Sequence, residues 1–362
     1  MKIKISKDQL LTGIGVVSNI VSPKATLPIL SNLLLESTGD VLKMNTTDLD
    51  IGISCELPVH SFEQGAITIP AKRFSDIIKE LPSGDVMILA RKNNQIEIEG
   101  INCRFKINGL PKEEFPKFPE FKERDAITIA QADLKEMIRL TSFAVSYEES
   151  RYVLNGILLE FSGDVARMIA TDGRRLAKME KKLVTATHKD MQMIIPIKAI
   201  NEINRNLKDV GECTIISSTN QVLFNIDGIL IATRIIEGEF PNYKQVIPKE
   251  TNVRAKIKTQ ELLSAIRRAN LLSTPDFQAI KFELFKDKLV ISKSTPDVGE
   301  SREEVSIEYG QQELMVGFNP QFFIDVLKNI SEDTVPIEFL GPDKPCVLRL
   351  GDYLYLALPM RL

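Results

Sequence analysis

The chain has 362 residues, of which 43% are hydrophobic and 26% charged, and its formal net charge is −3. This composition is typical of a soluble globular protein with two or three domains, and it argues against a protein that binds nucleic acid with its whole surface. No apolar run approaches 18 residues and the N-terminus lacks the apolar core of a secretory signal, so we expect a cytoplasmic protein that does not contact a membrane.

Cysteine and histidine are scarce. Cys55, Cys103, Cys213 and Cys346 lie far apart in apolar, strand-like runs without CxxC spacing, which predicts buried, reduced thiols and no metal site. The two histidines are His60 and His188, so a Ser-His-Asp triad is poorly supported. We therefore predict no catalytic residues and no cofactor.

A unit of strands and helices occurs three times along the chain. Each unit opens with a strand and an amphipathic helix, continues through strands to a second strand and helix, and closes with further strands. The first helices begin near Asp8, Asp133 and Gln260, and the second helices near Lys72, Lys198 and Gln321. Short turns such as "KNNQ", "STNQ" and "FKDK" separate the strands and favour hairpins over parallel crossovers, so we predict an α+β fold with antiparallel sheets.

The period of about 125 residues is domain-sized. We place three domains at 1–122, 126–248 and 251–362. Two proline-rich connectors join them, and both contain Glu-Phe-Pro, at 114–116 and at 239–241.

Positive charge is concentrated on the predicted helices. The first, third and last helices are neutral, the second and fifth carry +1 each, and the fourth carries +2 if it includes Lys208. The helices then total +4 and the rest of the chain −7. If all six helices faced one way, they would offer a weak, salt-dependent attraction to a phosphate backbone without sequence preference. Ordinary solvated helix faces would produce the same pattern.

One turn differs between the units. The middle unit reads "ATDGRRLAK" where the first reads "NTTDLDIGIS", so the Thr-Asp pair belongs to the repeat and the Gly-Arg-Arg does not. We expect Asp172 to cap its own turn through its side chain. Two adjacent arginines that occur once per chain indicate a single-use function, although exposed arginines in turns are often only solvated.

Two other functions compete at this point. "TGIGVV" contains Gly13 and Gly15 after a strand and partly matches a dinucleotide fingerprint, but the third glycine is missing and the run reads as a helix. A monomeric three-domain binder of peptides or glycans, without DNA, is the second alternative.

Six segments together resemble the bacterial sliding-clamp family, the beta subunits of DNA polymerase III. They are "TLPILSNLLLE", "RYVLNGILLE", "ATDGRRLA", "EFPNYKQVIP", "GFNPQFFIDVL" and the terminal "LPMRL", in the family's order over the whole chain. The resemblance implies three clamp domains per chain, each with two inward helices and outer antiparallel sheets, forming half of a ring. It implies a non-catalytic processivity factor whose homodimer encircles double-stranded DNA.

The resemblance also implies site residues. DNA contacts would come from Lys24, Lys72, Arg73, Lys198, Arg205 and Arg267. The dimer interface would include Phe105 and Ile107 on one side and Leu271 and Leu272 on the other.

Partners would insert short linear peptides into a groove between the second and third domains. These partners would be the replicative polymerase, the clamp loader, and repair or ligation proteins. Gly173 would admit the peptide backbone, and Arg175 would lie with its stem beneath the ligand and its head in solvent. The chain departs from the family pattern at Arg174, Gln245 and Val153. The matching positions are Leu154, Thr171, Gly173, Arg174, Arg175, Leu176, Pro241, Val246, Pro345, Leu358, Pro359, Met360 and Arg361.

Overall fold

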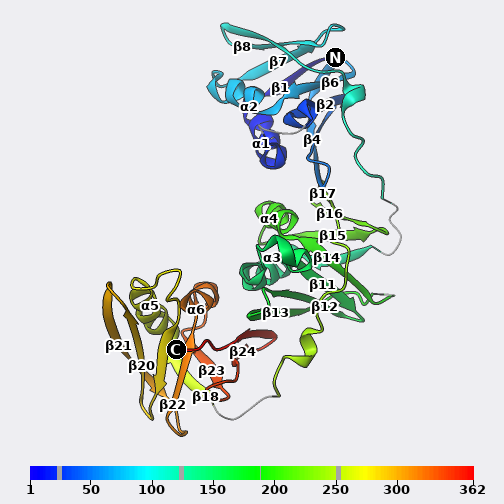
Figure 1. Cartoon of the computed structure of the whole chain (residues 1–362). Helices are drawn as coiled ribbons and strands as arrows, with labels where there is room; N and C mark the ends of the chain where they lie inside the picture. Colours follow the sequence, from blue (N-terminus) through cyan, green and yellow to red (C-terminus); the bar gives the residue numbers. More distant parts are fainter. Residues whose placement is uncertain (23–26, 122–125, 188, 250–253) are drawn as a thin grey trace. The chain divides into compact units, whose positions relative to one another are not determined.

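A computed structural model describes residues 1–22, 27–121, 126–187, 189–249 and 254–362. The chain divides into two compact units (Figure 1), Met1–Ala132 with Lys198–Ile235, and Asp133–Ile197 with Ile236–Leu362. The α-helices of the described residues are α1 (Lys7–Val17), α2 (Ala71–Glu80), α3 (Gln131–Thr141), α4 (Ile197–Asn206), α5 (Thr259–Asn270) and α6 (Pro320–Leu327).

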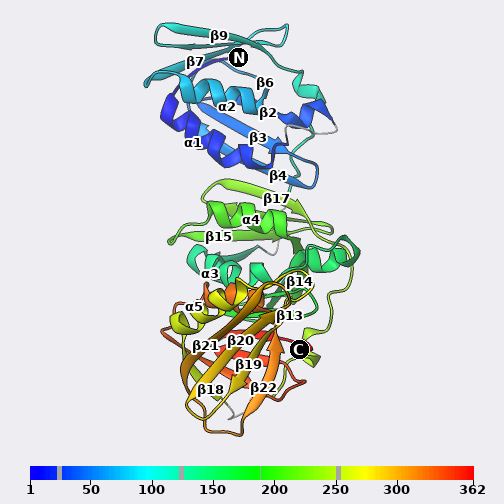
Figure 2. The ribbon, with the colours of Figure 1, turned by 60° about the vertical axis from the view of Figure 1, so that its left-hand side comes forward.

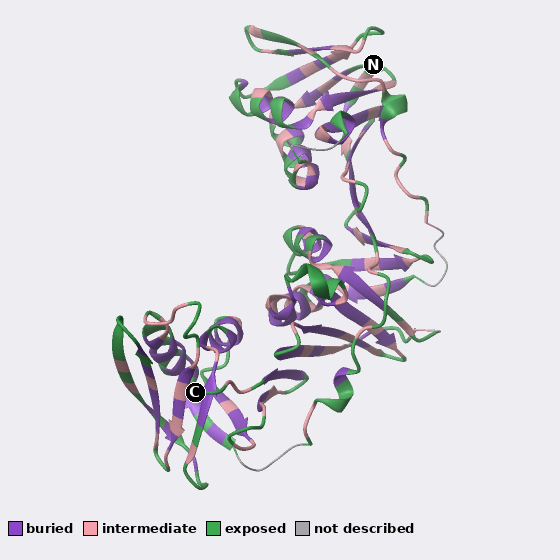
Figure 3. Cartoon of the chain, in the orientation of Figure 1, coloured by how far each residue is buried: buried purple, intermediate pink, exposed green. Residues whose placement is uncertain are grey.

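All six helices begin within two residues of the predicted starts. Their buried faces follow the helical period, as in α2, where Ala71, Phe74, Ser75 and Ile78 are buried. Figure 3 shows that in both units the buried residues gather where helices face strands. The α+β prediction is therefore confirmed.

Unit one contains a five-stranded and an eight-stranded antiparallel sheet (Figure 2). In the five-stranded sheet the order is β5 (His60–Glu63), β1 (Lys2–Ser6), β7 (Asp85–Ala90), β8 (Gln95–Gly100) and β9 (Cys103–Asn108). In the eight-stranded sheet it is β10 (Ile127–Ala130), β15 (Glu212–Ser217), β16 (Gln221–Ile226), β17 (Ile229–Arg234), β4 (Ile51–Pro58), β3 (Val41–Thr47), β2 (Asn32–Thr38) and β6 (Gly65–Pro70).

Unit two contains one twelve-stranded antiparallel sheet. Its order is β14 (Met191–Pro196), β11 (Gly156–Ser162), β12 (Val165–Thr171), β13 (Arg175–Lys182), β25 (Tyr353–Ala357), β24 (Cys346–Leu350), β23 (Thr334–Phe339), β18 (Arg254–Lys258), β21 (Gly299–Glu308), β20 (Lys288–Thr295), β19 (Ile280–Leu284) and β22 (Leu314–Phe318).

The repeats are joined by strand pairing as well as by the connectors. Strand β17 of the second repeat pairs with β4 of the first, and β25 of the third pairs with β13 of the second. The hairpins predicted at "KNNQ", "STNQ" and "FKDK" are present as β7–β8, β15–β16 and β19–β20.

The glycines of "TGIGVV" lie inside α1 and do not form a phosphate-binding loop. Gly13 allows the helix to approach the sheet, because a Cβ there would lie 2.6 Å from the Leu57 side chain and 2.9 Å from the Met44 sulfur. This packing role removes the basis for the dinucleotide reading.

Candidate functional site

The turn between β12 and β13 is capped by its own side chains, as predicted. Asp172 Oδ1 accepts hydrogen bonds from the backbone N–H groups of Arg174 at 2.9 Å and Arg175 at 3.0 Å. Thr171 Oγ1 donates to the Arg175 carbonyl at 2.6 Å and accepts from the Gly173 N–H at 3.0 Å. Gly173 has a φ of +86°, which favours glycine, and Arg151 Nη1 donates to the Asp172 carbonyl at 2.8 Å.

The predicted placement of Arg175 is wrong, because its head is buried and not solvated. The residue is only 9% exposed. Its guanidinium donates to Asp172 at 2.9 Å, to Asp325 of α6 at 2.8 Å and to the Phe143 carbonyl at 2.6 Å, and it lies 4.9 Å from the centre of the Phe322 ring. These contacts fix Arg175 between β13 and α6, so it positions the turn and is not available to a ligand.

Asp325 completes this network. Burial alone would raise the pKa of Asp325, but hydrogen bonds from Arg175, Lys328 and Gln321 outweigh burial and hold its pKa below the ordinary value. Sequence reasoning missed Asp325, and the signal was an acid in the otherwise apolar helix "PQFFIDVL".

An apolar cluster lies behind the turn. It contains Leu158, Ile169, Leu176, Ile194, Tyr243, Val347, Leu354 and Leu356, with Val153, Ile236, Phe240, Ile247 and Leu340 packed against it. Tyr243 donates its hydroxyl to Glu160 at 2.7 Å, and burial is the main reason why the pKa of Tyr243 is raised. Because these residues come from both sides of the β13–β25 pair, the cluster joins the second repeat to the third.

The structure brings the turn and the C-terminal segment together. The Leu358 N–H donates to the Arg174 carbonyl at 2.8 Å, next to the β13–β25 pairing. Among the predicted groove residues, five side chains and Gly173 are exposed and the other members are buried or half-buried. The exposed ones are Gly173, Arg174, Pro241, Val246, Leu358 and Arg361; the others are Leu154, Thr171, Arg175, Leu176, Pro345, Pro359 and Met360.

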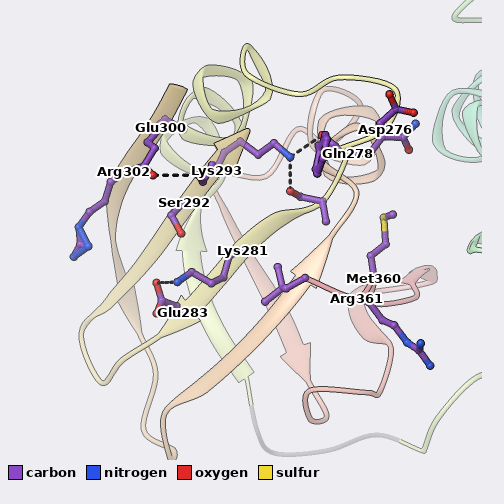
Figure 4. A pocket seen from close by; sticks show the side chains of 15 residues that line it. Asp276, Gln278, Lys281, Glu283, Ser292, Lys293, Glu300, Arg302, Met360 and Arg361 are labelled. Atoms are coloured by element: carbon purple, nitrogen blue, oxygen red, sulfur yellow. Dashed lines mark hydrogen bonds and ion pairs between the residues drawn. The ribbon is translucent and has the colours of Figure 1, made fainter. Parts of the chain in front are cut away.

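Met360 and Arg361 line a cavity of about 670 Å³ against β19, β20 and β21 (Figure 4). The Met360 N–H donates to the Gly317 carbonyl at 2.8 Å, and a Cβ on Gly317 would lie 2.6 Å from the Met360 carbonyl oxygen. The tail can therefore dock because residue 317 is glycine. In the same cavity Lys293 is buried and donates to the carbonyls of Phe277 at 2.7 Å and Ala279 at 2.9 Å; burial lowers its pKa.

The predicted DNA-contacting side chains on helices are exposed. They are Lys72 and Arg73 on α2, Lys198 and Arg205 on α4, and Arg267 on α5. Lys24 lies outside the described residues. Lys198 forms an ion pair with Asp48, and Arg205 pairs with Glu202 at 3.1 Å, so two of these cations are partly neutralised.

The predicted helical charge of +4 is too high. Lys208 lies beyond the end of α4 and Lys328 beyond the end of α6, so the observed helices carry a net +2. The helices remain more basic than the rest of the chain, but the electrostatic contrast is half as large as predicted.

The predicted interface residues lie at two strand edges and one helix end. Phe105 is 38% exposed and Ile107 half-buried on β9, the last strand of its sheet. Leu271 caps α5 with 80% exposure and Leu272 follows it, half-buried. Strand β21 pairs with β18 only at Ile307 and Glu308, so that edge is free from Gly299 to Ser306.

Cysteines and metals complete the survey. Cys55, Cys213 and Cys346 are buried, and burial raises the pKa of each thiol to about 12. Cys103 on β9 is half-buried, so the prediction of burial is wrong for this residue. Within the described ranges no group of His, Cys, Asp or Glu could hold a metal ion, and no helix there is long and apolar enough to cross a membrane.

Comparisons with known proteins cover the full chain. Family models of the DNA polymerase III beta subunit match as N-terminal domain at residues 1–119, central domain at 128–242 and C-terminal domain at 244–361. A beta sliding clamp of Chlamydia pneumoniae is 32% identical over 100% of this chain and 99% of its own length.

Solved structures agree with this likeness. The DNA polymerase III subunit beta of Pseudomonas aeruginosa has a TM-score of 0.96 and 31% identity, with both chains fully covered. A sliding clamp of the same organism, bound to griselimycin, has a TM-score of 0.96 and 31% identity, again over both full chains.

Proposed function

The chain belongs to the DNA polymerase III beta subunit family, the beta sliding clamps, and from this premise we propose that two copies close into a ring around duplex DNA. The family consists of non-catalytic processivity factors for DNA polymerase. The ring would act in the bacterial cytoplasm, slide without sequence preference and tether its partners by topology, with no bond made or broken.

Two free strand edges are the observation that carries this proposal. Within the chain, each junction between repeats continues a sheet through β4–β17 or β13–β25. In the repeat, β21 corresponds to β4 and β13, and β9 corresponds to β17 and β25. A head-to-tail pair of chains would therefore join β21 to β9 of the partner twice, and two such contacts close the assembly.

The two internal junctions also predict the register of this contact. Gly52 pairs with Ala232 and Leu176 with Leu356. The corresponding pair would be Glu300 opposite Lys106 of the partner subunit, with Ser301 opposite Phe105 of the partner subunit. Strand β9 contributes Arg104 and Lys106, whereas "GESREEVSIE" of β21 has an excess of acids, so the edges are complementary in charge. Leu271 and Leu272 would supply apolar contact beside the strands.

DNA would be held by weak contacts to phosphate. The exposed cations Lys72, Arg73 and Arg267 support this, because a net helical charge of +2 on an acidic chain attracts a polyanion only mildly. Weak attraction suits sliding, and the closed ring would prevent escape. The tethered polymerase would then rebind at high effective concentration.

Partners would dock short peptides on the surface formed by the 171–176 turn and the C-terminal segment. The exposed apolar side chains Pro241, Val246 and Leu358 support this, since they lie at the margin of the cluster that contains Leu176. Arg174 is exposed and free to contact a ligand, whereas Arg175 would hold the turn in place. The replicative polymerase, the clamp loader, and repair or ligation proteins would share this surface.

Retention on DNA of different topology tests the proposal. After loading, the protein should remain on a nicked circular duplex and leave within seconds of linearisation. Equal retention on circular and linear DNA would contradict encirclement. As a control, Glu300→Lys should weaken the dimer, and Lys106→Glu combined with it should restore the dimer measured by sedimentation.

A further inference from the structure

The first connector covers a crevice in unit one that the second connector does not leave in unit two. Phe115, Phe118 and Phe121 recur every third residue, a spacing that places them on one face of an extended polyproline-like segment. Phe115 packs on one small apolar cluster, while Phe118 and Phe121 pack on another. Between connector and sheet lies a cavity of about 860 Å³, here called the linker crevice.

The corresponding surface in unit two is filled. There Phe240 and Tyr243 join one continuous cluster with Leu158, Ile169 and Leu354. The repeat places Phe118 where Tyr243 lies, Asn45 where Ile169 lies and Glu36 where Glu160 lies. The crevice therefore arises because two smaller clusters replace one large cluster.

Polar groups in the linker crevice lack the partners that their counterparts have. Glu160 receives the Tyr243 hydroxyl at 2.7 Å, but phenylalanine at position 118 has no hydroxyl to offer Glu36. Asn45 donates to Glu36 at 3.4 Å, and its own buried carbonyl oxygen has no hydrogen-bond partner among the described residues. An unpaired buried acceptor is costly, so a donor from outside would be stabilised here.

The remaining lining defines the chemistry of that donor. Leu34, Ile216, Leu223 and Leu230 make much of the wall apolar. The acids Glu36, Glu113 and Glu120 are matched by Lys43, Lys112 and Lys117, so the crevice has no net charge to attract an ion. We propose that the linker crevice is a second peptide site, which takes an apolar segment bearing an uncharged amide donor for Asn45.

The occupant is a partner polypeptide, because the same face in unit two is filled by extended polypeptide of this chain. This site is separate from the surface at 171–176 and does not depend on ring closure. A glutamine or asparagine side chain next to leucine-like residues has the required donor and apolar surface.

The test uses the full-length protein and the capped peptide acetyl-Leu-Gln-Leu-amide, with acetyl-Leu-Glu-Leu-amide as matched control. Methyl NMR should show shifts at Leu34, Leu223 and Leu230 with a Kd near ~1 mM for the glutamine peptide. The glutamate peptide should bind at least about tenfold more weakly, because a carboxylate cannot donate to Asn45.

A variant separates this site from any other. Asn45→Ile copies the residue of unit two, so the fold should persist while the preference for glutamine over glutamate disappears. Leu358→Asp, at the second surface, should leave the shifts at Leu223 and Leu230 unchanged. Shifts confined to Leu176 and Leu356, no shifts up to about 5 mM peptide, or unchanged selectivity in Asn45→Ile would each overturn the linker-crevice proposal without affecting the proposed ring.

Discussion

The turns at 47–51 and 171–175 have the same backbone and different tasks. In the first turn, Asp48 Oδ1 accepts from the N–H groups of Asp50 at 3.0 Å and Ile51 at 2.8 Å, and Thr47 Oγ1 donates to the Ile51 carbonyl at 2.9 Å. The second turn repeats each of these bonds. The Thr-Asp pair is thus the structural part of the repeat, and the residues after it are free to diverge.

The divergence decides which junction has an open surface. At the position of Arg175 the first turn has Ile51, buried in the core, and at the position of Leu176 it has Gly52. A Cβ on Gly52 would lie 3.2 Å from the Phe118 ring, so the connector packs directly on the backbone there. The first turn is covered by the chain itself, whereas the second keeps Gly173 and Arg174 exposed.

The largest expected effect comes from removing the ion pairs of the second turn. Arg175→Met should lower the free energy of unfolding by about 3–5 kcal/mol, because Asp172 and Asp325 lose their buried partner. Urea denaturation of the full chain would measure it. Arg174→Met is the matched control and should change stability by less than about 0.5 kcal/mol; equal effects of the two variants would contradict the positioning role.

Making the first turn resemble the second should also destabilise the protein. Gly52→Leu places a side chain against the Phe118 ring and should cost about 1–3 kcal/mol by overpacking. Adding Phe118→Ala should recover part of this loss, since the ring is the obstacle. A cost that Phe118→Ala does not reduce would show that the connector does not pack on Gly52.

The third residue of each turn should respond in opposite directions. Gly173→Ala should cost about 1–2 kcal/mol, because φ is +86° and the new Cβ would lie 2.9 Å from Arg151 Nη1. Leu49 holds a φ of +80°, so Leu49→Gly should be neutral or stabilise the protein by up to about 1 kcal/mol. Thermal unfolding of both variants would check this contrast, and destabilisation by Leu49→Gly would refute it.

The smallest effect concerns acid. The pKa of Asp325 is lowered in the folded state, so its contribution to stability is complete above its unfolded pKa of about 3.9 and is lost as pH falls through the folded value. Asp325→Asn should therefore flatten the dependence of unfolding free energy on pH below about pH 4. An unchanged slope would mean that Asp325 is not ionised in the network.

The repeat, the six helices and the antiparallel hairpins could be predicted from sequence because they depend on local periodicity and turn residues. The role of Arg175 could not, because its partner Asp325 lies 150 residues away. The charge of the helices was overestimated because nothing local shows that α4 ends before Lys208. Lys198 was placed correctly on a helix, but its ion pair with Asp48 depends on tertiary packing.

The sheets that cross from one repeat to the next also determine how the protein would yield under load. Separating repeats within the chain requires a ladder such as β13–β25 to shear, with several N–H···O bonds failing together. A seam between β21 and β9 of two chains would have no connector beside it to restore its alignment after a break. Mechanical opening of the ring would therefore begin at that seam, and the chain's internal junctions would remain closed as a stiff half.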